Sequence, residues 1–176
     1  MNDNDISREF RIIGIDPGLE TTGVGILDVK GNKYIPIHSG CIITSKDNNM
    51  SIRLKKIFDE LSILINKFDP DCLAIEELFF SSNTKTAINV GHARGVLLLA
   101  GSINNLKIYE YTPLEIKQAV VGYGRATKEQ IKYMLKIILN TDDGFFPNKD
   151  DAWDAMAVSL CHANNQKFRD RTRAFK

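Results

Sequence analysis

Residues 10–16, FRIIGID, form an apolar run with no alternating polar face, and the run ends on a single acid, Asp16. A strand of this composition is typical of the interior of a sheet that is covered on both sides. A turn through Pro17-Gly18 follows, and a second, glycine-spaced apolar run occupies residues 21–29. The pattern predicts neighbouring strands at the start of the chain, with one carboxylate fixed at a strand end.

The rest of the chain adds three strands to this sheet and covers it with helices. Lys30-Gly31-Asn32 is a hairpin signal. Apolar residues recur at helical spacing over 50–68, and Asp69-Pro70 ends that helix. The further strands are expected at 33–45, 71–76 and 107–111, and the further helices at 84–103, 113–121, 127–140 and 149–164.

The element order βββαβαβααα predicts an α/β fold with a mixed five-stranded sheet, three antiparallel strands and then two parallel ones, flanked by helices. We expect one domain over residues 1–176, with flexible tails at 1–8 and 165–176. A hydrophobic content of 43% and a charged content of 26% are those of an ordinary globular protein. The net charge of +1 neither indicates nor excludes a nucleic-acid partner.

The cysteines and the N-terminal residues indicate a cytoplasmic protein. The three cysteines form no CxxC pair, which is typical of free thiols in a reducing compartment. The opening MNDNDISREF lacks the apolar segment of a signal peptide. The longest apolar run, 96–100, is far shorter than the ~20 residues of a membrane span.

Acids stand at three separate places in the predicted fold. Glu76 ends the strand at 71–76, which a right-handed crossover would place parallel to the first strand, so Glu76 and Asp16 should share one sheet edge. Asp151 and Asp154 are three residues apart and share a helix face. Asp154 lies in an apolar stretch, where a carboxylate is costly unless it is paired or bound to a metal.

Each acid also has an ordinary structural explanation. Asp16 could be a turn aspartate, Glu76 and Glu77 a solvated strand exit, and Asp150 and Asp151 acids of a first helical turn. Together they favour a different interpretation, because clustered carboxylates repel unless a cation lies between them. Mg²⁺ or Mn²⁺ suits oxygen ligands, and two such ions ~4 Å apart support phosphodiester hydrolysis.

The stretch around Asp16 also fits the ATP-binding hairpin of actin-like and sugar-kinase-like proteins. That architecture needs a second hairpin and a second domain. Asp143-Gly144 lies in a loop without flanking strands, and 176 residues supply one domain. The length and the acids therefore favour the metal-dependent nuclease.

Five motifs in order, IIGIDPGLETTGVGILD, GCIIT, DCLAIEELFFSSNTKTAINVGHARGVLLLA, EIKQAVVGYGRATKEQI and DDAWDAMAVSLCH, resemble the RuvC family of bacterial crossover-junction endodeoxyribonucleases over about residues 10–164. The resemblance implies an RNase H-like fold and a homodimer that cuts Holliday junctions symmetrically, leaving 5′-phosphate and 3′-hydroxyl ends. It also implies two Mg²⁺ ions and the RuvA–RuvB branch-migration complex as a partner. The family's four metal-binding acids fall on Asp16, Glu76, Asp151 and Asp154, a choice over Glu77 and Asp150 that spacing leaves open.

Two other interpretations are weaker. A catalytically inactive junction-binding module would not need all four acids. A smaller nuclease family that acts on ribosomal RNA precursors shares the first motif, but it explains the basic residues at 117–128 less well.

Basic residues gather between 117 and 136. By resemblance, Lys117 and Lys128 lie near the active site, where they would contact phosphate or stabilise transition-state charge. Arg125 lies between them and is a further candidate for DNA contact. For Lys132 and Lys136 we expect a solvated helix face.

Three further features bear on DNA and on assembly. Phe79 matches a family aromatic that stacks on bases at the junction point. Gly18 and the strand that follows it are expected to leave room for a DNA backbone. The helix at 84–103, with Gly91 and Gly95 on one face, is the candidate dimer interface. The alternative is that these glycines pack against the protein's own sheet. The basic tail at 166–176 could contact phosphate.

Overall fold

The computed structural model describes residues 10–78, 84–142 and 144–173, without the side chains of 84–86 and 167–173. The predicted N-terminal tail at 1–8 and the candidate Phe79 lie outside the described residues. Among the described residues, no helix combines the length and the apolar content that crossing a bilayer requires.

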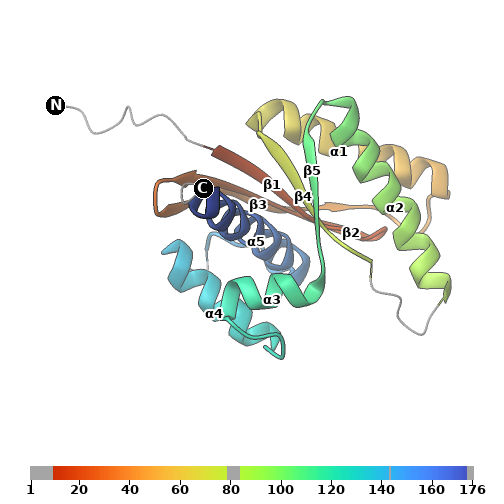
Figure 1. Cartoon of the computed structure of the whole chain (residues 1–176). Helices are drawn as coiled ribbons and strands as arrows, with labels where there is room; N and C mark the ends of the chain where they lie inside the picture. Colours follow the sequence, from red (N-terminus) through yellow and green to blue (C-terminus); the bar gives the residue numbers. More distant parts are fainter. Residues whose placement is uncertain (1–9, 79–83, 143, 174–176) are drawn as a thin grey trace.

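A five-stranded sheet lies at the centre of the molecule (Figure 1). Its strands are β1 (Phe10–Asp16), β2 (Thr21–Lys30), β3 (Lys33–Ile43), β4 (Cys72–Glu76) and β5 (Lys107–Tyr111). In the order β3-β2-β1-β4-β5, the pairs β3/β2 and β2/β1 are antiparallel, whereas β1/β4 and β4/β5 are parallel. The predicted mixed sheet is confirmed, with the apolar first strand in the middle.

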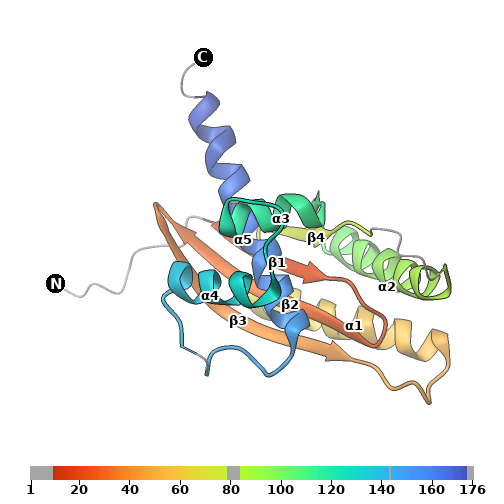
Figure 2. The same ribbon diagram turned by 90° about the horizontal axis from the view of Figure 1, so that it is seen from below.

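Helices cover both faces of the sheet (Figures 1 and 2). One face packs against α1 (Met50–Phe68) and α2 (Thr84–Ile103) around Ile13, Ile15 and Leu73. The other packs against α3 (Pro113–Val121), α4 (Lys128–Leu139) and α5 (Asp150–Arg173) around Ile12, Leu27 and Ala74. Because both faces of the central strands β1 and β4 are buried, these strands need no polar face, which explains their unbroken apolar runs.

The last helix differs from the prediction. It continues through Arg173, whereas a helix end near residue 164 and a flexible tail from 165 were expected. Residues 165–173 contain no glycine or proline, so nothing in the sequence breaks the helix there. Figure 2 shows this C-terminal part of α5 extending beyond the sheet, and residues 174–176 lie outside the described residues.

An ion pair fixes the start of β1. Arg11 Nε lies 2.5 Å from Asp28 Oδ1 on β2, and a second guanidinium nitrogen donates to the carbonyl of Phe68 at 2.6 Å. The main-chain N–H of Arg11 also donates to the carboxylate of Asp71 at 2.6 Å. Asp28 is 4% exposed, so its charge depends on this one guanidinium, which joins two strands to the end of α1.

Candidate active site

Asp16 and Glu76 lie side by side at one edge of the sheet. They end β1 and β4, which are parallel neighbours with Ile15 opposite Ile75. Side chains of a strand alternate between faces. Ile12 on β1 and Ala74 on β4 belong to the core beneath α5, so Asp16 and Glu76, an even number of residues further on, point to that same face.

Helix α5 reaches this edge because glycines let it approach the sheet. A Cβ on Gly23 would lie 1.9 Å from the carbonyl oxygen of Asp151, and one on Gly14 would lie 2.4 Å from that of Ala155. A Cβ on Gly25 would meet the α5 backbone at 2.7 Å. The α5 main chain therefore lies directly on β1 and β2, where any larger residue would hold it away.

The expectation that the strand after Gly18 leaves room for a DNA backbone was wrong. The strand glycines after the first turn are covered by α5, so they leave no room for a DNA backbone. At Gly18, a Cβ would lie 2.1 Å from the carbonyl oxygen of Thr21, which makes the tight turn itself the reason for glycine. The space beside the strand glycines is occupied by α5, the helix that carries Asp151 and Asp154.

The acids interact strongly with one another. Burial, followed by repulsion from Glu76, Asp154 and Asp151, raises the pKa of Asp16 to about 8. Burial, followed by repulsion from Asp154, raises the pKa of Glu76 to about 7, although a hydrogen bond with Asp16 and the charges of two lysines oppose the shift. Burial also raises the pKa of Asp154, against the nearby ammonium of Lys128. The structure thus brings the four predicted acids within interaction range of one another.

The carboxylates are suitable ligands for a divalent metal, although their side chains do not converge on a single point. No three acidic, histidine or cysteine side chains within the described ranges form a group ready to hold a metal ion. Burial is the main cause of the raised pKa values of Asp16 and Glu76, and repulsion from the neighbouring acids adds to it. A cation with oxygen ligands, such as Mg²⁺ or Mn²⁺, would relieve this repulsion.

Lys128 is held at the acidic edge by the start of α4. Thr127 caps the helix in a capping box with Gln130, which places Lys128 in the first turn. Its ammonium lies 3.3 Å from Asp154 Oδ2 and 3.5 Å from Asp150 Oδ2. The pKa of Lys128 is raised: burial lowers it, but the charges of Asp154 and Asp150 outweigh that effect.

A cavity of about 240 Å³ adjoins the acids. Glu76, Lys117, Lys128 and Asp154 line it together with apolar residues of α3, α4, α5 and the connection between α3 and α4. Arg125 lies exposed in the connection between α3 and α4, and it is not part of the lining that the described residues form. The two lysines implied by resemblance therefore meet the acids, whereas Arg125 does not.

Sequence reasoning missed Arg94 on α2. Its Nε donates to the main-chain carbonyl of Glu76 at 3.3 Å, and its guanidinium pairs with Glu110 on β5. Arg94 thus holds the backbone of a candidate ligand from the far side of the sheet. The available signal was an arginine just before the apolar run at 96–100 of this helix, but the sequence does not indicate which residue it pairs with.

Comparison with known proteins agrees with this geometry. The family model for crossover junction endodeoxyribonuclease RuvC matches residues 12–162. A crossover junction endodeoxyribonuclease RuvC of Alkaliphilus metalliredigens is 51% identical over 158 residues, which cover 90% of this chain and 95% of that protein. One of Desulforamulus reducens is 49% identical over 152 residues, covering 86% and 92%.

A solved structure of Thermus thermophilus RuvC in complex with a Holliday junction substrate superimposes with a TM-score of 0.85. It is 32% identical, and the match covers 91% of this chain and 96% of that one. The predicted RNase H-like class of mixed sheet is confirmed by this match.

Proposed function

Because this chain belongs to the RuvC family of crossover junction endodeoxyribonucleases, we propose that it resolves Holliday junctions in recombination and repair. It would do so by hydrolysing two symmetrically placed phosphodiester bonds, leaving 5′-phosphate and 3′-hydroxyl ends. The observation that carries the proposal is the meeting of four acids from β1, β4 and α5 at one sheet edge, at the positions of the family motifs.

We propose that Asp16, Glu76, Asp151 and Asp154 hold two Mg²⁺ ions, for which Mn²⁺ can substitute. The oxygen donors and the mutual repulsion of these acids support the assignment. Such a pair of ions supplies charge neutralisation and Lewis acidity at the scissile phosphate.

The chain's own cations act beside the acids. Lys117 and Lys128 face the cavity next to Glu76 and Asp154, so their ammonium groups would bind the phosphate and offset charge that develops in the transition state. The exposed Arg125 would contact the backbone further out. Phe79 follows β4 shortly after Glu76 in the sequence, and we propose that it stacks on a base at the junction point.

A homodimer would suit symmetric cleavage of the junction, and one face of α2 is a candidate interface for it. Two like strands are cut symmetrically when two identical sites are related by a twofold axis. The exposed side of α2 carries Ile88, Leu99 and Ile103, all more than half exposed, on either side of Gly95. A Cβ on Gly95 would meet nothing within 4 Å, so this glycine does not serve packing on its own sheet and is available to a second copy.

Two further proposals rest on the family alone. The RuvA–RuvB branch-migration complex is the expected partner on the junction. The expected location is the cytoplasm, where chromosomal DNA is accessible.

The catalytic proposal is tested with a synthetic four-way junction in Mg²⁺. Asp154→Asn should lose at least ~100-fold in cleavage rate, while Asp59→Asn, which removes an exposed acid on α1, should cleave like the wild type. Duplex and single-stranded DNA of the same sequence should be cut far more slowly than the junction. Equal cleavage by wild type and Asp154→Asn would refute the site assignment.

The dimer is tested separately. Leu99→Asp puts a charge on the exposed face of α2 and should yield monomers in sedimentation experiments, with the fold retained. An unchanged sedimentation mass would exclude this face as the interface.

A further inference from the structure

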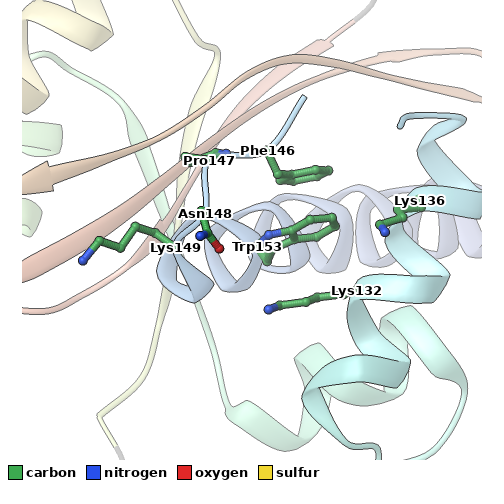
Figure 3. Close-up of a pocket in the computed structure, with 7 residues that line it drawn as sticks. All are labelled: Lys132, Lys136, Phe146, Pro147, Asn148, Lys149 and Trp153. Carbon is green, nitrogen blue, oxygen red and sulfur yellow. The ribbon is translucent and has the colours of Figure 1, made fainter. Parts of the chain in front are cut away.

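The start of α5, which carries two of the four acids, is held by an aromatic stack. The rings of Phe146 and Trp153 lie with their centroids 3.6 Å apart, and they line part of a cavity of about 330 Å³ between α4 and the loop before α5 (Figure 3). The ammonium groups of Lys132 and Lys136 lie 5.8 and 5.7 Å from the Trp153 ring centroid, within range of a cation–π interaction. The expectation that these two lysines form only a solvated helix face was therefore wrong, because a buried tryptophan of α5 holds them.

Asp16, the acid of β1, depends on a different support. It lies opposite Gly23 on β2, but the ladder between β1 and β4 ends at Ile15, one residue before this acid. Beyond Asp16, the chain reaches β2 through the short turn at 17–20. The conformation of this turn therefore bears directly on the position of the Asp16 carboxylate.

Buried threonines fix the turn through its main-chain carbonyls. Thr22 Oγ1 donates to the carbonyl of Gly18 at 2.6 Å. Thr44, which directly follows β3, donates twice: its Oγ1 to the carbonyl of Leu19 at 2.6 Å, and its main-chain N–H to that of Glu20 at 2.9 Å. The two threonines are 0% and 2% exposed, so water has little access to compete for these hydrogen bonds.

Arg53 of α1 sets the direction of the Thr44 hydroxyl. The Nε of Arg53 donates to Thr44 Oγ1 at 2.8 Å. Because a guanidinium can only donate hydrogen bonds, the hydroxyl accepts this one and directs its own proton to the carbonyl of Leu19. The bonds form a directional relay, from Arg53 through Thr44 to Leu19, in which each bond polarises the next.

We propose that Arg53 and Thr44 are positioning residues for Asp16, which hold the turn so that the Asp16 carboxylate faces the acids of β4 and α5. The inference rests on the proposed function, since it assumes that these acids bind Mg²⁺. Both residues act through the main chain of the turn and not by contact with the ion or the DNA. Groups that orient a metal ligand typically contribute about 10- to 100-fold to metal affinity, so loss of the relay should weaken Mg²⁺ binding.

The test measures Mg²⁺ affinity without catalysis. A ligand of the folded state raises the melting temperature, and the dependence of this temperature on Mg²⁺ concentration gives the dissociation constant. Thr44→Val removes the hydroxyl and keeps the branched shape, and it should bind Mg²⁺ about tenfold more weakly than the wild type. Thr44→Ser keeps the hydroxyl and should restore the wild-type affinity. Thr141→Val is the matched control, because the Thr141 hydroxyl is buried and has no hydrogen-bond partner among the described residues.

Arg53→Gln separates the relay from a simple charge effect. Loss of a positive charge would by itself strengthen the binding of Mg²⁺. The relay predicts the opposite, an affinity about tenfold weaker than that of the wild type. Because the two residues act in series, the double variant Thr44→Val/Arg53→Gln should bind Mg²⁺ no more weakly than the weaker of the two single variants.

A cooperative melting transition without Mg²⁺ shows that a variant is folded. Folded Thr44→Val and Arg53→Gln variants that bind Mg²⁺ like the wild type would overturn the proposal. Additive losses in the double variant would also overturn it, since they would mean that the two residues act separately. An Arg53→Gln variant with wild-type Mg²⁺ affinity and weaker junction binding would overturn it as well, and would make Arg53 a DNA contact.

Cleavage separates this inference from the proposed function. The relay variants should cleave a four-way junction slowly at low Mg²⁺ and recover at saturating Mg²⁺, because the ligand is displaced but still present. A wild type that neither responds to Mg²⁺ nor cleaves the junction would refute the proposed function. A wild type that does both, with unaltered Mg²⁺ affinity in the relay variants, would refute the relay alone.

Discussion

Gly23→Ala adds one methyl group where β2 meets the start of α5. That Cβ would lie 1.9 Å from the carbonyl oxygen of Asp151, whereas real Cβ atoms essentially never come within 3.0 Å of another heavy atom. The obstacle is main chain, so no side-chain rotation relieves it. The first turn of α5 must move away from the sheet by about 1.1 Å, from 1.9 to at least 3.0 Å.

The expected losses follow from this displacement. Overpacking of a close contact costs about 1–3 kcal/mol in the free energy of unfolding. A shift of about 1 Å in the position of catalytic groups can cost about 100-fold in rate. Because Asp151 and Asp154 would move with the start of α5, we expect Gly23→Ala to cleave junctions about 100-fold more slowly than the wild type.

The matched control is Gly101→Ala on α2. Its Cβ would meet the Leu73 side chain at 3.0 Å, a methyl group that can rotate away on the opposite face of the sheet. Initial cleavage rates in Mg²⁺ and thermal unfolding are measured for both variants. Gly23→Ala that is folded and cleaves within threefold of the wild type would refute the claim that these glycines position the acids.

Three further predictions concern charged groups. Arg11→Met should lower the free energy of unfolding in urea by about 3–5 kcal/mol, since it leaves buried Asp28 without its partner; a loss below 1 kcal/mol would contradict this. Arg94→Gln should raise the Mg²⁺ concentration for half-maximal cleavage about tenfold, because it releases the backbone of Glu76; an unchanged requirement would contradict the positioning role. In chelator, the unfolding free energy should fall from about pH 4 to about pH 8, because unfolded carboxyls ionise first while the folded pKa of Asp16 is about 8. Asp16→Asn should remove much of this slope and be more stable than the wild type at pH 8, on the order of 3 kcal/mol, with no difference near pH 4.

Much of the fold could be predicted because it depends on local patterns. Short apolar runs bounded by turn residues indicate the strands, and helical spacing indicates the helices. Asp69-Pro70 indeed ends α1, where Asp69 takes the left-handed conformation. The meeting of Asp16 and Glu76 was also predictable, since parallel neighbours joined by a right-handed crossover place their carboxyl ends at one edge.

The errors concern contacts between distant elements. The spacing of Gly23 and Gly25 shows a strand without bulk on one face, but it cannot show whether DNA or α5 fills the space. Lys136 reads as a surface lysine until Trp153, 17 positions further along the sequence, is known to lie beneath it. Such roles depend on which surfaces meet, which local periodicity does not encode.

The close approach of α5 explains why the metal-free site opposes folding. Glycines bring the α5 backbone onto β1 and β2, and the helix delivers two acids to an edge that already holds Asp16 and Glu76. Lys128 offsets part of this repulsion, since its ammonium lies 3.3 Å from Asp154. A divalent cation that binds only the folded site would offset more, and mass action then converts its binding into stability. Mg²⁺ should therefore raise the melting temperature of the wild type at pH 8 and raise that of Asp16→Asn much less. An equal rise in both proteins would mean that the ion binds elsewhere and that the acids are not its ligands.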